Sequence, residues 1–130
     1  MEAIQNLTSR NSPRELTTPM PSKEEMNEVY KAALRAPDHA WLRPSRFIEV
    51  TGKGLDKLSE IFFEFALSNI EGATAPQLEK YKSAPFRAPM VIVLITKISE
   101  HPKVPAIEQM LSTATAVSYT HLTLPTNREV

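Results

Sequence analysis

The pattern of apolar and polar positions along the chain predicts helices that alternate with buried strands. Helices are expected over residues 2–9, 23–35, 55–70, 76–82 and from about 105 to 117, and strands over 46–51 and 90–96. The strand at 90–96 is apolar throughout and rich in β-branched residues, which is typical of a central strand covered on both faces. This order of elements indicates an α+β or α/β sandwich.

Two of the helices have distinct patterns of their own. Ser22 stands three residues before Glu25, which is the spacing of a capping box that opens a helix. One face of that helix is expected to be buried and holds Met26, Val29, Ala33 and Leu34. The helix over 55–70 has apolar residues on more than one face, so we expect it to pack on two sides; they are Leu58, Ile61, Phe62, Phe65 and Leu67.

Length and charge narrow the classes of protein to which the chain can belong. Its 130 residues suffice for one modest domain. Lysine and arginine together number 15, as do aspartate and glutamate, so the zero net charge predicts no nucleic-acid partner and no anionic membrane surface. There is no cysteine, no secretory signal pattern and no apolar run long enough to cross a bilayer, so we expect a cytoplasmic protein.

Two loops carry residues that suit the binding of an anionic ligand. Arg10 and Ser12 follow the first helix, where a guanidinium and a hydroxyl can grip a phosphate and its polyol, although a solvated basic loop is the commoner reading of such residues. Arg35 and His39 can contact an anionic aromatic cofactor. The alternative is that Asp38 and His39 cap the helix end or pair with each other.

Other kinds of site find less support in the sequence. Trp41 either closes a pocket or pins its loop to the core, and core packing is the better prediction for an isolated aromatic residue. The three glycines form no phosphate-binding loop. His39, His101 and His121 show no metal-ligand spacing, and no nucleophile elbow is present, so we expect neither a metal nor a catalytic triad.

Several short motifs occur in an order that resembles the nitroreductase family, in particular its short, single-domain NAD(P)H nitroreductases. The resemblance covers about residues 1–117. The motifs are Arg10-x-Ser12, Arg35-Ala-Pro-Asp-His39, Pro44-x-x-Phe47, Ala84-Pro-Phe-Arg-Ala-Pro89 before an apolar strand, and Lys103-Val-Pro with Glu108-Gln109. The combination of the second and fourth motifs is specific, although each is short.

The resemblance implies a fold, a cofactor and a reaction. The fold would be α+β, with a mixed sheet flanked by helices, in an intertwined homodimer that holds FMN at its interface. Arg10, Asn11 and Ser12 would hold the phosphate and ribityl chain, and Arg35 and His39 would approach the flavin from the partner subunit. Hydride would pass from NAD(P)H through FMN to a nitroaromatic, quinone or similar acceptor. The side chains would then be cofactor contacts rather than catalytic groups.

The sequence also departs from the family pattern. Asn11 stands where the family has a second arginine, and Arg43 and Ser45 replace the residues usual around Pro44. After Val117 the family register is lost, so we expect 118–130 to be an unrelated or artefactual tail, the fold to be incomplete at its C-terminus, and the chain as given to be inactive with little FMN. A non-catalytic flavin-binding protein and a small interaction module are the alternative functions.

Overall fold

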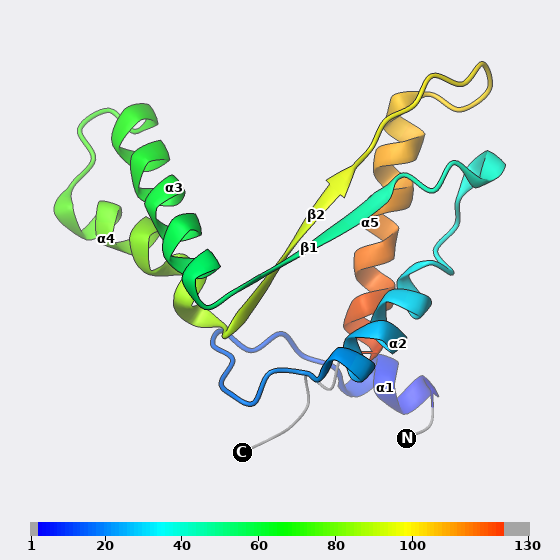
Figure 1. Cartoon of the computed structure of the whole chain (residues 1–130), viewed down its shortest axis with the longest axis horizontal. Coiled ribbons are helices and arrows are strands. Elements are labelled where there is room, and N and C mark those ends of the chain that lie inside the picture. The colour runs from blue at the N-terminus through cyan, green and yellow to red at the C-terminus, as the bar shows by residue number, and fades with distance from the viewer. Residues whose placement is uncertain (1–2, 124–130) are drawn as a thin grey trace. The chain divides into compact units, whose positions relative to one another are not determined.

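The computed structural model describes residues 3–123, and within this range the elements follow the expected order (Figure 1). The helices are α1 (Ala3–Ser9), α2 (Lys23–Ala33), α3 (Lys53–Asn69), α4 (Ala75–Ser83) and α5 (Ala106–Thr123), the 3-10 turns are η1 (His39–Trp41) and η2 (Ala84–Arg87), and the strands are β1 (Ser45–Thr51) and β2 (Met90–Thr96). The α+β class predicted from the sequence is therefore confirmed.

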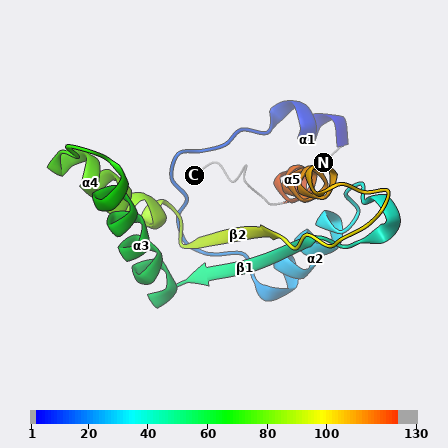
Figure 2. The same ribbon diagram turned by 90° about the horizontal axis from the view of Figure 1, so that it is seen from above.

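The two strands pair with each other and run in opposite directions, as the arrows in Figure 2 show. Beyond the end of β2, the amide of Lys97 donates to the carbonyl oxygen of Pro44 at 2.8 Å. Residues along β2 are half-buried and Ile95 is exposed. The expectation of a central strand covered on both faces is wrong for this chain: the described residues supply β2 with only one neighbouring strand, and its side chains are half-buried or exposed rather than buried.

The chain forms two compact units. The first comprises the described parts of Met1–Pro13, Pro21–Phe47 and Leu94–Val130, and in it α2 packs against α5. The capping box predicted at the start of α2 is present, since Ser22 Oγ accepts from the amide of Glu25 at 3.2 Å and Glu25 Oε2 accepts from the amide of Ser22 at 2.8 Å.

Helix α2 buries most of the face that the sequence pattern assigned to it. Met26, Val29 and Ala33 are buried, as expected. Leu34 is exposed, contrary to expectation, because the helix ends at Ala33 and Leu34 forms its C-cap. Tyr30 of α2 packs against Phe47 of β1, with the ring centroids 5.1 Å apart and the ring planes tilted by 36°. Helix α2 therefore contacts both α5 and the start of the sheet.

Helix α5 buries its small and polar face rather than its apolar one. Its buried residues recur at helical spacing and are Gln109, Thr113, Ala116 and Thr120. Ile107, Met110 and Leu111 are exposed. The helix continues to Thr123, so its predicted end at Val117 is wrong, while residues 124–130 of the expected tail lie outside the described range. No helix between residues 3 and 123 is both long and apolar enough to cross a membrane.

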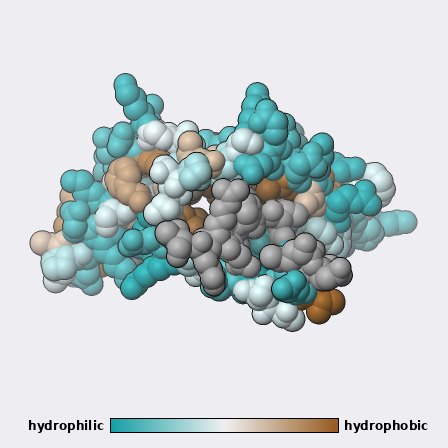
Figure 3. Space-filling view, turned by 90° about the horizontal axis from the view of Figure 1, so that it is seen from below, coloured by the Kyte–Doolittle hydropathy of each residue, from teal (hydrophilic) through white to brown (hydrophobic). Residues whose placement is uncertain are grey.

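The second unit comprises Arg14–Met20 and Ile48–Val93, and α3 packs against α4 within it. Ser59 Oγ of α3 donates to the carbonyl oxygen of Lys82 in α4 at 2.6 Å. Leu55 and Ala66 are buried, but the predicted packing of α3 on two sides is wrong within this chain. Its exposed apolar residues are Ile61, Phe62, Phe65 and Leu67. Figure 3 shows one face of the molecule, on which apolar side chains, in brown, lie at the surface among hydrophilic ones.

Candidate functional site

The first group of expected ligand-binding residues forms a small polar cluster just after α1. Arg10 Nη1 donates to Ser12 Oγ at 2.9 Å and to the carbonyl oxygen of Asn11 at 3.2 Å. Asn11 and Ser12 are exposed and Arg10 is half-buried. The guanidinium and the hydroxyl thus meet at the surface, where both can donate to one anion, and this arrangement fits a phosphate group.

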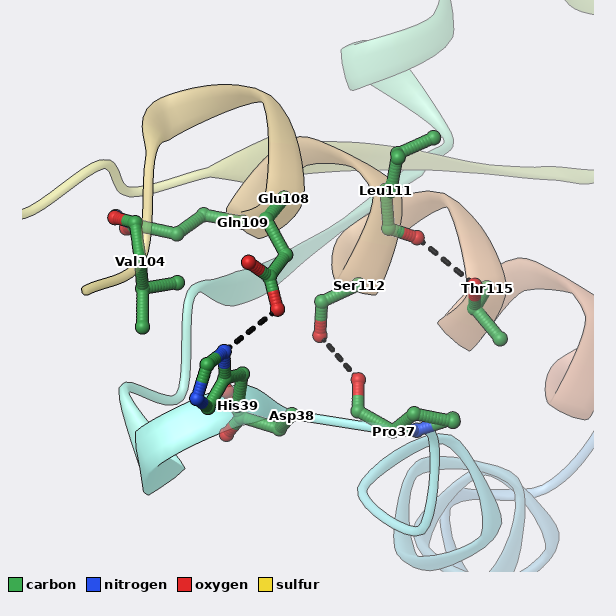
Figure 4. A pocket seen from close by; sticks show the side chains of 9 residues that line it. All are labelled: Pro37, Asp38, His39, Val104, Glu108, Gln109, Leu111, Ser112 and Thr115. Carbon is green, nitrogen blue, oxygen red and sulfur yellow. Dashed lines mark hydrogen bonds and ion pairs between the residues drawn. The ribbon is translucent and has the colours of Figure 1, made fainter.

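The second group lies on the loop between α2 and β1, which α5 holds at two points (Figure 4). His39 Nδ1 lies 2.7 Å from Glu108 Oε1, and Ser112 Oγ donates to the carbonyl oxygen of Pro37 at 2.6 Å. Glu108 and Ser112 are four residues apart on α5, so their side chains leave the same face of the helix. The expected alternative, in which His39 pairs with Asp38 or caps α2, is wrong because Glu108 is the partner of His39.

The same loop has an unusual backbone and an exposed aromatic residue. Ala40, Trp41 and Arg43 have φ angles of 59°, 55° and 51°, which lie in the left-handed region that non-glycine residues rarely adopt. Asp38 Oδ2 accepts from the amide of Arg43 at 2.9 Å and closes the turn. Trp41 is 75% exposed, with the guanidinium carbon of Arg43 4.9 Å from its ring, so the prediction that it packs in the core is wrong.

A cavity of about 220 Å³ lies between this loop and α5 (Figure 4). It is lined by Pro37, Asp38, His39, Val104, Glu108, Gln109, Leu111, Ser112 and Thr115. Its volume is below the roughly 300–1,000 Å³ of most small-molecule pockets. Within one chain it can therefore hold part of a cofactor-sized ligand, with the ring of His39 and the carboxylate of Glu108 among its polar groups.

Arg35 lies just after α2 and is exposed. Its backbone amide donates to the carbonyl oxygen of Ala32 at 2.9 Å, whereas its guanidinium has no hydrogen bond or ion pair with any residue from 3 to 123. No such bond joins the Arg10 cluster to Arg35 or His39 in this range either. The hydrogen bonds of the described residues therefore join Arg10 to Ser12 and His39 to α5, but they connect neither of these sets to the other nor to the side chain of Arg35.

Glu108 and Ser112 were not expected as site residues from the sequence. Both are polar side chains one helical turn apart, and that spacing was the available signal. It does not identify a partner, because the loop that they contact lies 69 and 75 residues away along the chain. Among residues 3–123 there is also no group of three His, Asp or Glu side chains that could hold a metal ion.

Comparison with known sequences gives a consistent assignment. The model of the nitroreductase family matches residues 7–125 of this chain. YdjA of Escherichia coli (strain K12), which carries the provisional name NAD(P)H nitroreductase, is 34% identical over 117 residues, or 90% of this chain. The match covers 63% of YdjA, so the chain spans less than two thirds of the length of this relative.

Solved structures show the same fold at lower sequence identity. A nitroreductase-like family protein from Bacillus cereus has a TM-score of 0.75 at 19% identity, over 95% of this chain and 64% of that protein. The FMN-dependent nitroreductase NfnB from Mycobacterium smegmatis, solved in complex with NADPH, has a TM-score of 0.66 at 17% identity, over 93% and 68%. Together with the match to the family model, these similarities establish that the chain belongs to the nitroreductase family.

Proposed function

We propose that the protein is an FMN-dependent oxidoreductase that transfers hydride from NAD(P)H through FMN to a nitroaromatic, a quinone or a similar acceptor. The observation that carries this proposal is the cluster of Arg10, Asn11 and Ser12, whose guanidinium and hydroxyl meet within 2.9 Å at the surface. Family membership supports it, as does the FMN dependence of the Mycobacterium smegmatis enzyme with the same fold.

Arg10 and Ser12 would bind the phosphate of FMN, and the exposed cation of Arg35 would add a further positive charge to the ligand site. Asn11 stands where the resemblance to the family implies a second arginine, so phosphate binding would depend mainly on the charge of Arg10. His39 would contact the flavin from the loop held by α5. FMN supplies the hydride chemistry when it is bound, and the protein binds and orients it.

We further propose a homodimer with FMN at its interface. In one chain, no hydrogen bond or ion pair between residues 3 and 123 joins the Arg10 cluster to the loop of His39, so a site made from both groups can draw them from two subunits. The exposed apolar face of α5, formed by Ile107, Met110 and Leu111, suits burial against a second copy. The cytoplasmic location stays a prediction from the sequence.

FMN binding by the 130-residue chain tests the proposal directly, and binding by the wild-type chain would also contradict the expectation from the sequence that the chain as given holds little FMN. Trp41 is the only tryptophan, so its fluorescence can follow a titration with FMN without a label. We expect Arg10→Ala to weaken binding by about tenfold or more, because a hydrogen bond to a charged group contributes about 1.5–3 kcal/mol. Lys80→Ala removes one positive charge from the exposed face of α4 and should leave the affinity unchanged.

Two results would overturn the proposed flavin site: a wild-type chain that does not bind FMN, or an Arg10→Ala variant that binds it as tightly as wild type. A non-catalytic flavin-binding protein is the alternative function. It predicts FMN binding without steady oxidation of NAD(P)H when a nitroaromatic or quinone acceptor is supplied. Turnover with either acceptor would exclude it.

A further inference from the structure

Two side chains of α5 contact the loop that carries His39. Glu108 contacts the imidazole itself, at 2.7 Å, and Ser112 contacts the backbone two residues earlier, at the carbonyl oxygen of Pro37. Because the two side chains are one helical turn apart, they approach the loop from the same face of α5 (Figure 4). One rigid helix therefore fixes both the ring and the chain that leads to it.

The contact with Glu108 also decides which ring nitrogen of His39 a ligand can use. An ionised carboxylate can only accept hydrogen bonds, so Nδ1 must carry a proton to bond with Glu108 Oε1. Nε2 is then the ring nitrogen left for a ligand, and in the neutral ring it is an acceptor. The His39 ring has no other hydrogen-bond or ion-pair partner among residues 3–123, so Glu108 alone selects this tautomer there.

Stability alone does not account for these contacts. The side chains of His39 and Glu108 are 54% and 43% exposed, and a polar contact this exposed contributes little to folding, whether or not the ring is charged. The residues that follow His39 have a left-handed backbone at Ala40 and Trp41, a conformation that persists only where its surroundings hold it. The two contacts from α5 are therefore best understood as controlling the position of the loop.

We propose that Glu108 and Ser112 are positioning residues for His39. Glu108 fixes the orientation and the tautomer of the His39 imidazole, so that Nε2 is available to the flavin. Ser112 fixes the backbone of the same loop at the carbonyl oxygen of Pro37. The identity of the ligand at Nε2 rests on the proposed function. The geometry of the imidazole does not, and the two parts can be tested separately.

The first test reads the tautomer of His39 by NMR of the ligand-free chain labelled with ¹⁵N-histidine. The chain has three histidines, and the signals lost in His39→Gln assign the relevant ring. In alkaline buffer, where imidazole is neutral, we expect the proton on Nδ1 in wild type. Glu108→Ala should move it towards Nε2, because no carboxylate then remains to accept from Nδ1.

A matched control removes a comparable ion pair elsewhere. Glu28→Ala deletes the carboxylate that pairs with Lys31 on the exposed surface of α2, and the His39 signals should not change. A wild-type His39 with its proton on Nε2 would overturn the proposal. A tautomer that is the same in wild type and Glu108→Ala would do so as well.

The second test measures FMN affinity through Trp41 fluorescence in a double-mutant cycle. We expect Glu108→Ala to weaken binding about two- to fivefold in the wild-type background, the range of an exposed ion pair, and to add nothing once His39 is alanine. Ser112→Ala should also weaken binding, and Ser112→Thr, which keeps the hydroxyl, should restore it.

The outcomes separate the inference from the proposed function. If His39→Ala weakens FMN binding but Glu108→Ala does not, His39 remains a flavin contact and the positioning role is refuted. Equal losses from Glu108→Ala with and without His39 also refute it, since Glu108 would then act independently. If the wild-type chain does not bind FMN, the proposed function fails, while the NMR measurement still decides whether Glu108 controls His39.

Discussion

Gln109 links α5 to the segment that precedes it in the first unit, and its substitution tests how much this link contributes to stability. Its side chain is 2% exposed on the face of α5 that packs inward. The amide oxygen accepts from the backbone amide of Ser99 at 3.0 Å, and Nε2 donates to the carbonyl oxygens of Ser99 at 2.8 Å and Val104 at 3.2 Å. One side chain thus fixes the segment between β2 and α5, and we predict that Gln109→Leu destabilises the protein.

The expected loss follows from these three hydrogen bonds, since the fourth, from Ser99 Oγ to the amide oxygen of Gln109, is 3.5 Å long and adds little. Leucine fills a similar volume, so the main change is the removal of the bonds rather than the creation of a cavity. Each bond contributes about 1 kcal/mol, which gives about 3 kcal/mol in total. Val104 is buried, so its carbonyl oxygen loses a partner that water does not easily replace. Ser99 is exposed, so its amide and carbonyl oxygen can form hydrogen bonds with water instead. We therefore expect a loss of about 2–4 kcal/mol.

Urea denaturation followed by circular dichroism measures this loss as the change in the free energy of unfolding. Gln5→Leu makes the same substitution at an exposed position of α1 and should change that free energy by less than about 0.5 kcal/mol. If Gln109→Leu proves as stable as wild type to within the same margin, Gln109 is not the buried link between α5 and the segment before it, and the reasoning is refuted.

Two further predictions concern local structure. Ser22→Ala removes the capping box of α2 and should lower the free energy of unfolding by about 1 kcal/mol; no change in urea denaturation would show that the cap does not stabilise α2. Ala40→Gly should instead raise stability by about 0.5–1 kcal/mol, because glycine adopts the φ of 59° without the strain that alanine incurs. A less stable Ala40→Gly variant would show that the backbone at this residue is not left-handed.

The features predicted correctly from the sequence depend on neighbours a few residues away. The capping box of Ser22 and Glu25 spans three residues, and the run from Met90 to Thr96 is a strand as expected. The family motifs were equally readable, since they are short strings in a fixed order. That Arg10 and Ser12 bond to each other also follows from their closeness in the chain.

The errors concern which side of an element is covered. Trp41 was expected in the core and is exposed, and α3 was expected to pack on two sides but leaves Phe65 exposed. In α5 the buried face holds Gln109 and Thr113, whose polar groups find hydrogen-bond partners. A hydrophobic pattern does not reveal such a face, because burial of a polar side chain depends on partners that the pattern does not identify.

The sequence by itself therefore determined the elements, the motif order and the chemical kinds of residue at the candidate site. Only the tertiary structure placed Glu108 and Ser112 against the loop of His39, across 69 and 75 residues of chain. The physical reason is the range of the interactions. Caps and periodicity act within a few turns of backbone, whereas the partner of an imidazole is chosen by how distant helices and loops pack together.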